Sequence, residues 1–316
     1  MDKVLIHIGY QKTGSTWLQK TLFKRGDKVF EPINERDSGA SNLARHFFKD
    51  PEGNLLSPFD ENLKNIKDSL KWHLDNNPIP EGKIPVLSNE RLAGNAHAAG
   101  FDAAQVASRL RSTFPNGKVL ITIRDQRSII LSIYFLYLSR GGTMSLKRYL
   151  NSRYDGKRPH FSPNHINYLP LTRHYSKLFG KHNVKVIPLE LLETNSNEFL
   201  SEIGQFVGRK LAFDQINLDE KINKTSNHFI NYHFRVANHF LWSNSLNNYS
   251  SLNNRYMGKA VSLMAKAAAF FIPPRLDELR KRKMEIEINQ WVADRYKVCN
   301  QELSQEIGLD LSLFGY

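Results

Sequence analysis

The sequence predicts an α/β fold in which a central parallel sheet lies between helices. Short runs rich in Val, Ile and Leu predict four strands, at residues 3–9, 84–89, 118–124 and 183–189. The stretches between these runs have helical periodicity or loop composition, which is the alternation expected of a parallel sheet covered by helices. The first run also leads directly into a glycine-containing loop and then into a helical pattern. We therefore expect a three-layer fold of the P-loop type, with helical insertions and C-terminal helices.

The loop GYQKTGST at residues 9–16 differs from the usual nucleotide-triphosphate loop at one position. That loop reads Gly, four residues, Gly, Lys, then Ser or Thr. Here both glycines and the final hydroxyl keep their places, but Ser15 stands where the lysine belongs and the lysine lies inside the loop, at Lys12. Backbone N–H groups and the N-terminus of the following helix can still bind an anion. We expect this loop to bind a phosphate-like group.

The stretch TWLQKTLFKRG, residues 16–26, predicts a short helix directly after the loop. Its apolar residues fall on one helical face, and Gly26 is a typical residue at a helix C-terminus. The order strand, loop, helix is the one that a phosphate-binding loop requires.

The third predicted strand ends at Arg124, where we expect a second anion site. The residues that follow, DQRSIILSIYFLYLSRGG, have the spacing of a buried helix face that ends at Gly141, and Ser128 and Ser132 share another face. An arginine at the carboxyl end of a parallel strand, followed by a helix with a hydroxyl, is well placed to bind a phosphate. The alternative is an arginine in an ion pair at the end of a strand. The anion loop at residues 9–16 favours the second phosphate site.

These two motifs are similar to those of the sulfotransferases that use 3′-phosphoadenosine 5′-phosphosulfate (PAPS). GYQKTGSTWL resembles the 5′-phosphosulfate loop of that family, and the matching positions are Lys12, Gly14, Thr16 and Trp17. RDQRSIILSIY resembles the family's 3′-phosphate motif, and the matching positions are Arg124, Ser132 and Tyr134.

The resemblance extends along the chain, with two departures. Residues 184–208 resemble the family's fourth strand and following helix, and the ending NQELSQEIGLDLSLFGY resembles that of bacterial members. The proline that is common in each motif is replaced by glutamine, at Gln11 and Gln126. These replacements affect the expected rigidity of the two loops but remove no hydrogen-bond donor.

The resemblance implies an enzyme that moves a sulfuryl group from PAPS to an acceptor hydroxyl by in-line displacement and releases 3′,5′-adenosine bisphosphate. Negative charge builds on the bridging oxygen that leaves with the 5′-phosphate, so a lysine inside the loop is well placed to stabilise it. The donor-binding residues implied are Lys12, Thr13, Gly14, Ser15, Thr16, Trp17, Arg124 and Ser132. We expect no metal, because two phosphate sites on one nucleotide fit the sequence better than a triphosphate with magnesium, and neither CxxC nor HExxH occurs.

The acceptor hydroxyl must lose its proton as it attacks, so a general base is expected near the sulfur. Family members use a histidine or a glutamate, which leaves the choice open. Our candidate is Glu90 in VLSNERL, because it follows the second predicted strand at the same sheet edge as the loop. His7 is a rival, although a histidine inside a strand is more often a packed core residue. His160 and His165, on a basic and aromatic loop, are further candidates.

We expect residues 1–316 to form a single sulfotransferase domain. The polar stretch 29–77 is expected outside the sheet, as a cap or acceptor-binding insertion, and residues 151–170 as a functional loop over the site. Residues 276–307 have amphipathic spacing that predicts one long or two abutting helices. The stretch KINKTSN, residues 221–227, resembles the family region that supplies further donor contacts, with Lys224 and Ser226 as candidates.

Composition narrows the class of partner without choosing one. Hydrophobic residues make up 41% and charged residues 24%, as in ordinary globular proteins. The net charge of +13 favours polyanions such as nucleic acid, acidic glycans or a highly phosphorylated nucleotide. We expect a hydroxyl-bearing acceptor, with a carbohydrate as one candidate class, and not a nucleic acid. No apolar stretch approaches the roughly 20 residues of a membrane span, and the first residues lack the layout of a signal peptide, so we expect a cytoplasmic protein.

Two other functions remain open at this point. A P-loop nucleotide or small-molecule kinase requires an acidic residue that binds magnesium at the end of a strand. Among the residues that follow the four predicted strands, our candidate for this role is Asp125. The displaced loop lysine opposes this alternative. A non-enzymatic polyanion-binding protein requires clustered basic and aromatic stripes, whereas Lys and Arg are spread along the chain apart from RKRK at 280–283.

Overall fold

The computed structural model confirms the predicted α/β class. It describes residues 4–24, 28–33, 43–48, 59–152, 161–211, 228–241, 246–247, 250 and 272–316. Five parallel strands form one sheet in the order β2-β3-β1-β4-β5. The strands are β1 (Leu5–His7), β2 (Phe30–Pro32), β3 (Ile84–Ser88), β4 (Lys118–Ile123) and β5 (Val184–Pro188).

The expectation that residues 29–77 lie outside the sheet is wrong for β2. Phe30 to Pro32 pair with Ile84 to Val86 of β3 and form the edge of the sheet. Three residues are too few to show a strand periodicity, and a proline argues against a central strand while remaining acceptable at an edge. Later in this stretch lie the short helix α2 (Arg45–Phe48) and the long helix α3 (Phe59–Asn76). Whether this region contacts an acceptor stays a prediction.

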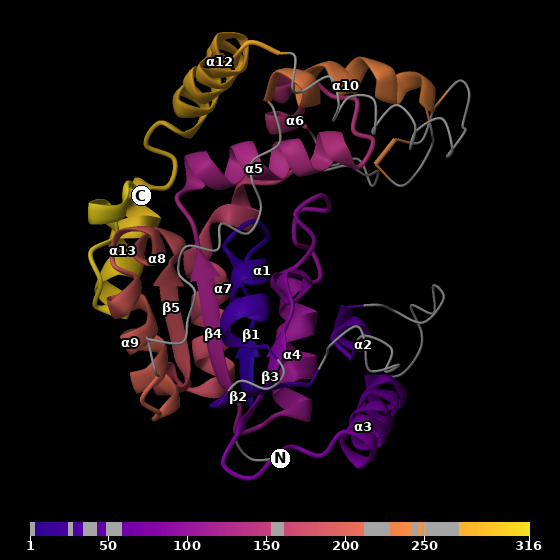
Figure 1. Ribbon diagram of the computed structural model, residues 1–316, viewed down its shortest axis with the longest axis vertical. Coiled ribbons are helices and arrows are strands. Elements are labelled where there is room, and N and C mark those ends of the chain that lie inside the picture. Colours follow the sequence, from indigo (N-terminus) through magenta and orange to yellow (C-terminus); the bar gives the residue numbers. More distant parts are fainter. Residues whose placement is uncertain are drawn as a thin grey trace.

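Helices lie on both sides of the sheet and give the three layers (Figure 1). Buried apolar side chains pack between the sheet and these helices. Leu5 and Leu120 pack on one face with the helices that follow the anion loop and β5. These are α1 (Ser15–Trp17) with the π-helical turn η1 (Leu18–Leu22), α8 (Leu189–Thr194) and α9 (Ser196–Val207). Ile6 and Ile121 pack on the other face, where α4 (Ala103–Thr113), α7 (Tyr168–Phe179) and α13 (Lys297–Ile307) supply buried residues.

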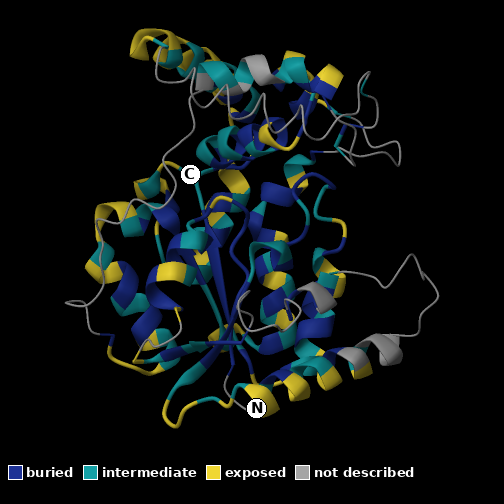
Figure 2. Ribbon diagram, turned by 45° about the vertical axis from the view of Figure 1, so that its right-hand side comes forward, coloured by how far each residue is buried: buried dark blue, intermediate teal, exposed yellow. Residues whose placement is uncertain are grey.

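A group of helices lies above the carboxyl ends of the strands. Helix α5 (Gln126–Ser139) crosses over the sheet, and α10 (His228–Leu241) and α12 (Pro274–Val292) lie beyond it in Figure 1. The short helix α6 (Leu146–Leu150) lies in the same group. In Figure 2 the strands and the facing sides of the helices are buried, while exposed residues lie on the outer helical faces.

The remaining predicted helices are confirmed with adjusted ends, and the role of residues 151–170 as a loop over the site stays a prediction. The helix after the anion loop ends at Leu22, and Gly26 lies outside the described residues. Residues 276–307 form two helices, α12 and α13, separated where Ala293 adopts a positive φ of 38°. In the predicted loop 151–170, residues 153–160 are not described, and the rest contains the 3₁₀ turn η5 (Pro163–Ile166) and the start of α7.

Three further 3₁₀ turns connect these elements. They are η4 (Glu90–Ala93), η6 (Lys181–Asn183) and η9 (Leu311–Phe314). Over the described part of the chain, no helix has the length and apolar character needed to cross a membrane.

Candidate functional site

The anion loop leaves β1 in the middle of the sheet, where Gly9 lies directly against β4. A Cβ atom at Gly9 would lie 2.1 Å from Thr122 Oγ1 and 2.8 Å from His7 Nε2. The backbone N–H of Tyr10 donates to the Thr122 carbonyl at 3.2 Å. A side chain at position 9 would therefore push the loop away from the sheet, and glycine is required because of this close approach.

Two residues of the loop adopt left-handed backbone conformations. Lys12 has a φ of 73° and Gly14 a φ of 78°. Such a conformation is unusual for a lysine and is often found where the surrounding structure fixes a functional loop. Thr13, between them, is fully buried. Its Oγ1 donates to the Tyr10 carbonyl at 2.6 Å and lies 2.9 Å from Thr122 Oγ1.

The predicted donor-binding side chains of the loop divide into two groups. Thr13 and Trp17 are buried in the protein, Thr13 in the hydrogen bonds above and Trp17 in the core beside Leu5. They therefore support the loop, and the Thr13 hydroxyl is already engaged within the protein. Ser15 is also buried, but its Oγ has no hydrogen-bond partner within the described residues. A buried hydroxyl without a partner costs free energy, so a ligand oxygen at Ser15 would satisfy it.

Lys12 is an exposed residue whose ammonium group nevertheless lies in an unfavourable electrostatic environment. Partial desolvation by the surrounding protein lowers the pKa of Lys12, the positive charges of Arg124 and Arg140 lower it further, and the negative charge of Glu90 opposes them. The two anion motifs and the candidate base thus influence the same ammonium group. A lysine whose pKa is lowered by desolvation and by neighbouring cations is the arrangement expected where a polyanionic ligand binds.

Arg124 connects the two predicted motifs. Its Nη1 donates to Ser132 Oγ of α5 at 3.2 Å and, more weakly, to the backbone carbonyl of Lys12 at 3.4 Å. The structure therefore brings together the arginine, the helix serine and the anion loop, which the sequence predicted as two anion sites. Tyr134, the third match to the 3′-phosphate motif, is buried and donates from its hydroxyl to the Met144 carbonyl at 2.9 Å. It fixes the segment after α5.

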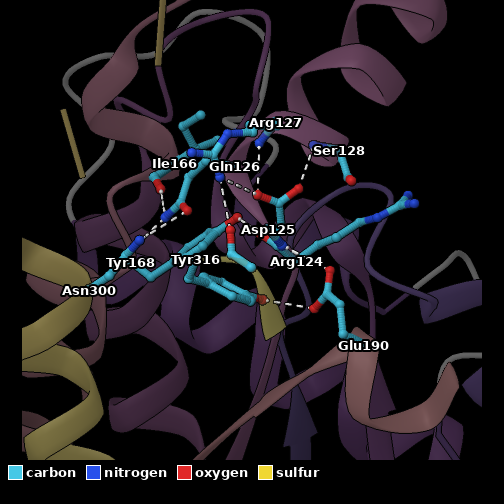
Figure 3. Close-up of polar contacts among 11 residues, drawn as sticks. Arg124, Asp125, Gln126, Arg127, Ser128, Ile166, Tyr168, Glu190, Asn300 and Tyr316 are labelled. Carbon is cyan, nitrogen blue, oxygen red and sulfur yellow. Dashed lines mark hydrogen bonds and ion pairs between the residues drawn. The ribbon is translucent and has the colours of Figure 1, made fainter. Parts of the chain in front are cut away.

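A second set of residues holds the turn that contains Arg124 (Figure 3). The Tyr168 hydroxyl donates to the Arg124 carbonyl at 2.5 Å, and the Asp125 N–H donates to Glu190 Oε1 at 3.0 Å. Tyr316 donates from its hydroxyl to Glu190 Oε2 at 3.1 Å. Burial raises the pKa of the Glu190 carboxyl, and its hydrogen bonds with Asp125 and Tyr316 oppose that rise.

Sequence reasoning missed these supporting residues. Glu190 directly follows the fourth predicted strand, so the rule that led to Arg124, a polar residue at a strand end, could have found it. Tyr168 and Tyr316 lie far from the motifs in sequence, and no spacing rule connects them to Arg124. Arg140 was also missed; its position at the C-terminal end of α5 gives no signal of the charge that it places near Lys12.

Glu90 is the first residue of η4, immediately after β3, as expected from its place in the sequence. The preceding Asn89 caps this turn by accepting a hydrogen bond from the Arg91 N–H at 2.9 Å. Arg91 in turn forms an ion pair with the buried Asp102, which fixes the turn to the start of α4. Because the charge of Glu90 raises the pKa of Lys12, the carboxylate and the ammonium group interact across the site.

The histidine candidates are placed less favourably for proton transfer. His7 is fully buried, with Nδ1 at 2.7 Å from Ser88 Oγ and Nε2 at 3.1 Å from Thr122 Oγ1, and burial lowers its pKa to about 3. His165 is buried against the Tyr10 ring, and burial lowers its pKa to about 4. His160, Lys224 and Ser226 lie outside the described residues.

Comparisons with known proteins identify the fold and the family of the chain. The crystal structure of a sulfotransferase from Alicyclobacillus acidocaldarius is similar to the chain with a TM-score of 0.50 and 17% identity, over 75% of this chain and 94% of that one, and shows the same fold. The sulfotransferase domain from the curacin biosynthetic pathway matches with a TM-score of 0.41 and 14% identity, over 70% of this chain and 79% of that one. No curated protein matches the chain. The model of the sulfotransferase domain family matches residues 2–262, and the chain therefore belongs to the sulfotransferase family of transferase enzymes.

Proposed function

We propose that the chain takes its sulfuryl group from PAPS and transfers it to a hydroxyl of the acceptor. The observation that supports this donor most directly is the position of Arg124, whose guanidinium hydrogen-bonds both Ser132 of α5 and the backbone of Lys12. Two anion sites therefore lie at the ends of the neighbouring strands β1 and β4. A nucleotide with phosphates at both its 5′ and 3′ positions fits two such sites.

Each anion site would bind one end of the donor. The backbone N–H groups of the loop and Ser15 Oγ would hold the 5′ end, because that buried hydroxyl has no partner in the described structure. Arg124 and Ser132 would hold the 3′-phosphate through a charge-assisted hydrogen bond and a hydroxyl. The donor supplies the sulfuryl group, and the remaining steps depend on residues of this chain.

Lys12 and Glu90 would perform the two charge-dependent steps. The Lys12 ammonium lies in the loop that holds the 5′ end and would stabilise the negative charge that develops on the departing phosphate oxygen. Glu90 begins the turn after β3 and interacts electrostatically with Lys12. Its carboxylate would accept the proton of the attacking hydroxyl. Both residues belong to one sheet edge, so the acceptor would enter between them.

The acceptor is proposed only as a chemical class. Membership of the family implies a hydroxyl-bearing acceptor. The net charge of +13 and the basic, aromatic composition of residues 151–170 favour a carbohydrate or an anionic molecule. A single domain over residues 1–316 is supported by one buried core cluster that includes both Val4 and Leu311. The cytoplasmic location stays a prediction.

Calorimetry with nucleotides tests the donor assignment. The ligands are 3′,5′-adenosine bisphosphate, ADP, and ATP with magnesium, each titrated into the wild type and into Arg124→Ala. We expect metal-independent binding of the bisphosphate, tighter than that of ADP, and a loss of this preference in Arg124→Ala. Preferred binding of ATP with magnesium, unchanged in the variant, would contradict PAPS as donor and favour the kinase alternative.

The structure gives the kinase alternative little support. The carboxylate of Asp125, its candidate magnesium ligand, caps α5 by accepting hydrogen bonds from the N–H groups of Arg127 and Ser128 at 3.3 and 2.9 Å. This carboxylate is therefore already engaged.

The polyanion-binding alternative depends on the basic run at 280–283. This run lies on α12, where Arg280 stacks on Tyr232 and Lys281 pairs with Glu285. That run is part of a helix surface, and the ring contacts of the described residues place only Arg280 of this run on an aromatic side chain.

A further inference from the structure

The turn that begins with Arg124 is connected to a distant part of the chain by a pair of buried side-chain amides. Gln126 Nε2 donates to Asn300 Oδ1 at 2.9 Å, and Asn300 Nδ2 donates to Gln126 Oε1 at 3.1 Å. Gln126 is the first residue of α5, and Asn300 lies on α13. Both are buried, with 2% and 7% of their surface exposed. Gln126 Nε2 also donates to the Ile166 carbonyl at 3.5 Å. Loss of Asn300 would therefore leave this long hydrogen bond at Nε2 and remove the Asn300 donor to the buried Gln126 Oε1.

The last residues of the chain form a second connection to the same turn. Arg127 Nη1 donates to the Gly315 carbonyl at 2.8 Å. The Tyr316 hydroxyl donates to Glu190, whose other carboxylate oxygen accepts the Asp125 N–H at 3.0 Å. In Figure 3 Gln126 and Asn300 lie on the side of the turn away from the Arg124 side chain, and Glu190 lies below that side chain. Residues 297–316 thus contact Gln126 and Arg127 directly and reach Asp125 through Glu190.

These contacts lie around the turn that carries the Arg124 side chain. A functional side chain must be held within about 0.5 Å of its productive position, and the residues behind it determine how well it is held. Tyr168 holds the Arg124 carbonyl, Glu190 of α8 accepts the Asp125 N–H, and Asn300 of α13 holds the Gln126 side chain. Without the contacts from residues 297–316, Gln126 and Glu190 would each lose a buried partner and the turn could move relative to Ser132.

We propose that residues 297–316 position the Arg124 turn, with Asn300 and Tyr316 as positioning residues that set the affinity of the site for the 3′-phosphate. The proposal rests on the assignment of Arg124 and Ser132 to that phosphate. Neither Asn300 nor Tyr316 touches the donor in this arrangement. Their influence passes through Gln126 and through Glu190.

The backbone at Gln126 permits a direct test by substitution. Gln126 is the first helical residue of α5, where the N–H has no partner within the helix and proline is well tolerated. The preceding Asp125 has φ −44° and ψ 133°, an extended conformation compatible with a following proline. The ring of Gln126→Pro would therefore stiffen the start of α5 without using Asn300.

The experiment measures the affinities of 3′,5′-adenosine bisphosphate and of 5′-AMP by calorimetry. The variants are Asn300→Leu, Tyr316→Phe, and Asn300→Leu combined with Gln126→Pro. We expect Asn300→Leu and Tyr316→Phe to weaken bisphosphate binding about tenfold, the effect of one buried hydrogen bond, and to leave 5′-AMP binding unchanged. The combined variant should recover to within about threefold of the wild type. Tyr316→Phe removes one hydroxyl only, so it remains informative if Asn300→Leu does not fold.

Arg173→Gln is the matched control. Arg173 pairs with Glu302 and Glu306, which ties α7 to α13 on the protein surface without touching the turn. This variant should bind both nucleotides like the wild type. Equal losses for both nucleotides in Asn300→Leu and Tyr316→Phe, or the same loss in Arg173→Gln, would show a general effect of docking α13 and overturn the proposal.

Hydrogen exchange separates this proposal from the donor assignment. If the wild type binds 5′-AMP and the bisphosphate equally, the assignment of Arg124 to a 3′-phosphate fails. The positioning role is then decided by exchange of the Asp125 amide, which is bonded to Glu190. Faster exchange of this amide in Asn300→Leu and Tyr316→Phe supports positioning of the turn, and unchanged exchange overturns it.

Discussion

Lys12 is the residue on which the proposed chemistry depends most, because its ammonium group would stabilise the charge on the departing phosphate oxygen. It lies inside the anion loop, in a left-handed backbone conformation. We predict that Lys12→Met slows sulfuryl transfer about 10²–10³-fold, the usual loss when one preorganised charge is removed from a transition state. Single-turnover rates at saturating PAPS measure this. The control is Lys20→Met, which changes an exposed lysine of η1, on the helix after the loop. A rate of Lys12→Met close to that of the control would contradict the assigned role.

The lowered pKa of Lys12 predicts a dependence on alkaline pH. Desolvation, Arg124 and Arg140 favour the neutral amine, so Lys12 loses its proton at a lower pH than an ordinary lysine. The charged form is the active one, and kcat/KM should therefore fall as pH rises through this lowered pKa. Arg140→Gln removes one of the two cations and should move the fall to higher pH. A pH–rate profile of both proteins decides the point, and an identical alkaline limb would exclude Lys12 as its source.

The role of Glu90 predicts a separation of catalysis from donor binding. Glu90→Gln keeps the shape of the side chain but removes its ability to accept a proton. We expect kcat to fall about 10²–10⁴-fold. Calorimetry should show an affinity for 3′,5′-adenosine bisphosphate no weaker than that of the wild type, because no donor contact is lost. Retention of most of the rate would transfer the role of base to another residue.

At the scale of the elements, the position of the anion loop depends on the close approach of Gly9, just after β1, to Thr122 of β4. We predict that Gly9→Ala destabilises the protein by about 1–3 kcal/mol, the usual effect of overpacking, because the new Cβ would lie 2.1 Å from Thr122 Oγ1. The penalty should be smaller in a Thr122→Ala background, where that oxygen is absent. Urea unfolding of the four proteins measures the difference. Equal penalties in both backgrounds would show that the hydroxyl of Thr122 does not set the close approach.

Sequence reasoning succeeded for elements whose pattern is local. The four predicted strands and the two motifs are continuous stretches, and the rule that parallel strands end at one sheet edge was enough to place Lys12, Glu90 and Arg124 together. It failed for β2, because three residues at an edge have no periodicity. It also failed for the supports of the Arg124 turn, since Asn300 and Tyr316 reach that turn only through the packing of α13.

At the scale of the whole molecule, buried histidines predict sensitivity to acid. His7, His97 and His165 are buried, and burial lowers their pKa values to about 3, 3 and 4. In the unfolded chain a histidine binds its proton near pH 6.5, so below this pH the unfolded state binds more protons than the folded state. The free energy of unfolding should therefore fall as pH decreases, by about 2 kcal/mol per histidine between pH 7 and pH 5.

Urea unfolding at pH 7, 6 and 5 checks this prediction. Ordinary carboxylates titrate mainly below this range, so they contribute little to the slope. Within the described residues His97 Nε2 has no hydrogen-bond partner, which makes His97→Gln a suitable comparison. This variant should lose about a third of the pH dependence. A stability that does not change between pH 7 and pH 5 would mean that these side chains can take up protons without unfolding the protein.

Because β1 and β4 are neighbouring strands, the sheet fixes the distance between the two proposed anion sites. The two strands pair in register, His7 opposite Leu120, and neighbouring strands are about 4.8 Å apart with little freedom to separate. The loop at the end of one strand and the Arg124 turn at the end of the other therefore keep a constant span. A nucleotide with its second phosphate at the 2′ position would present a different span. The protein would reject such an isomer by length alone, before any contact with the base is made.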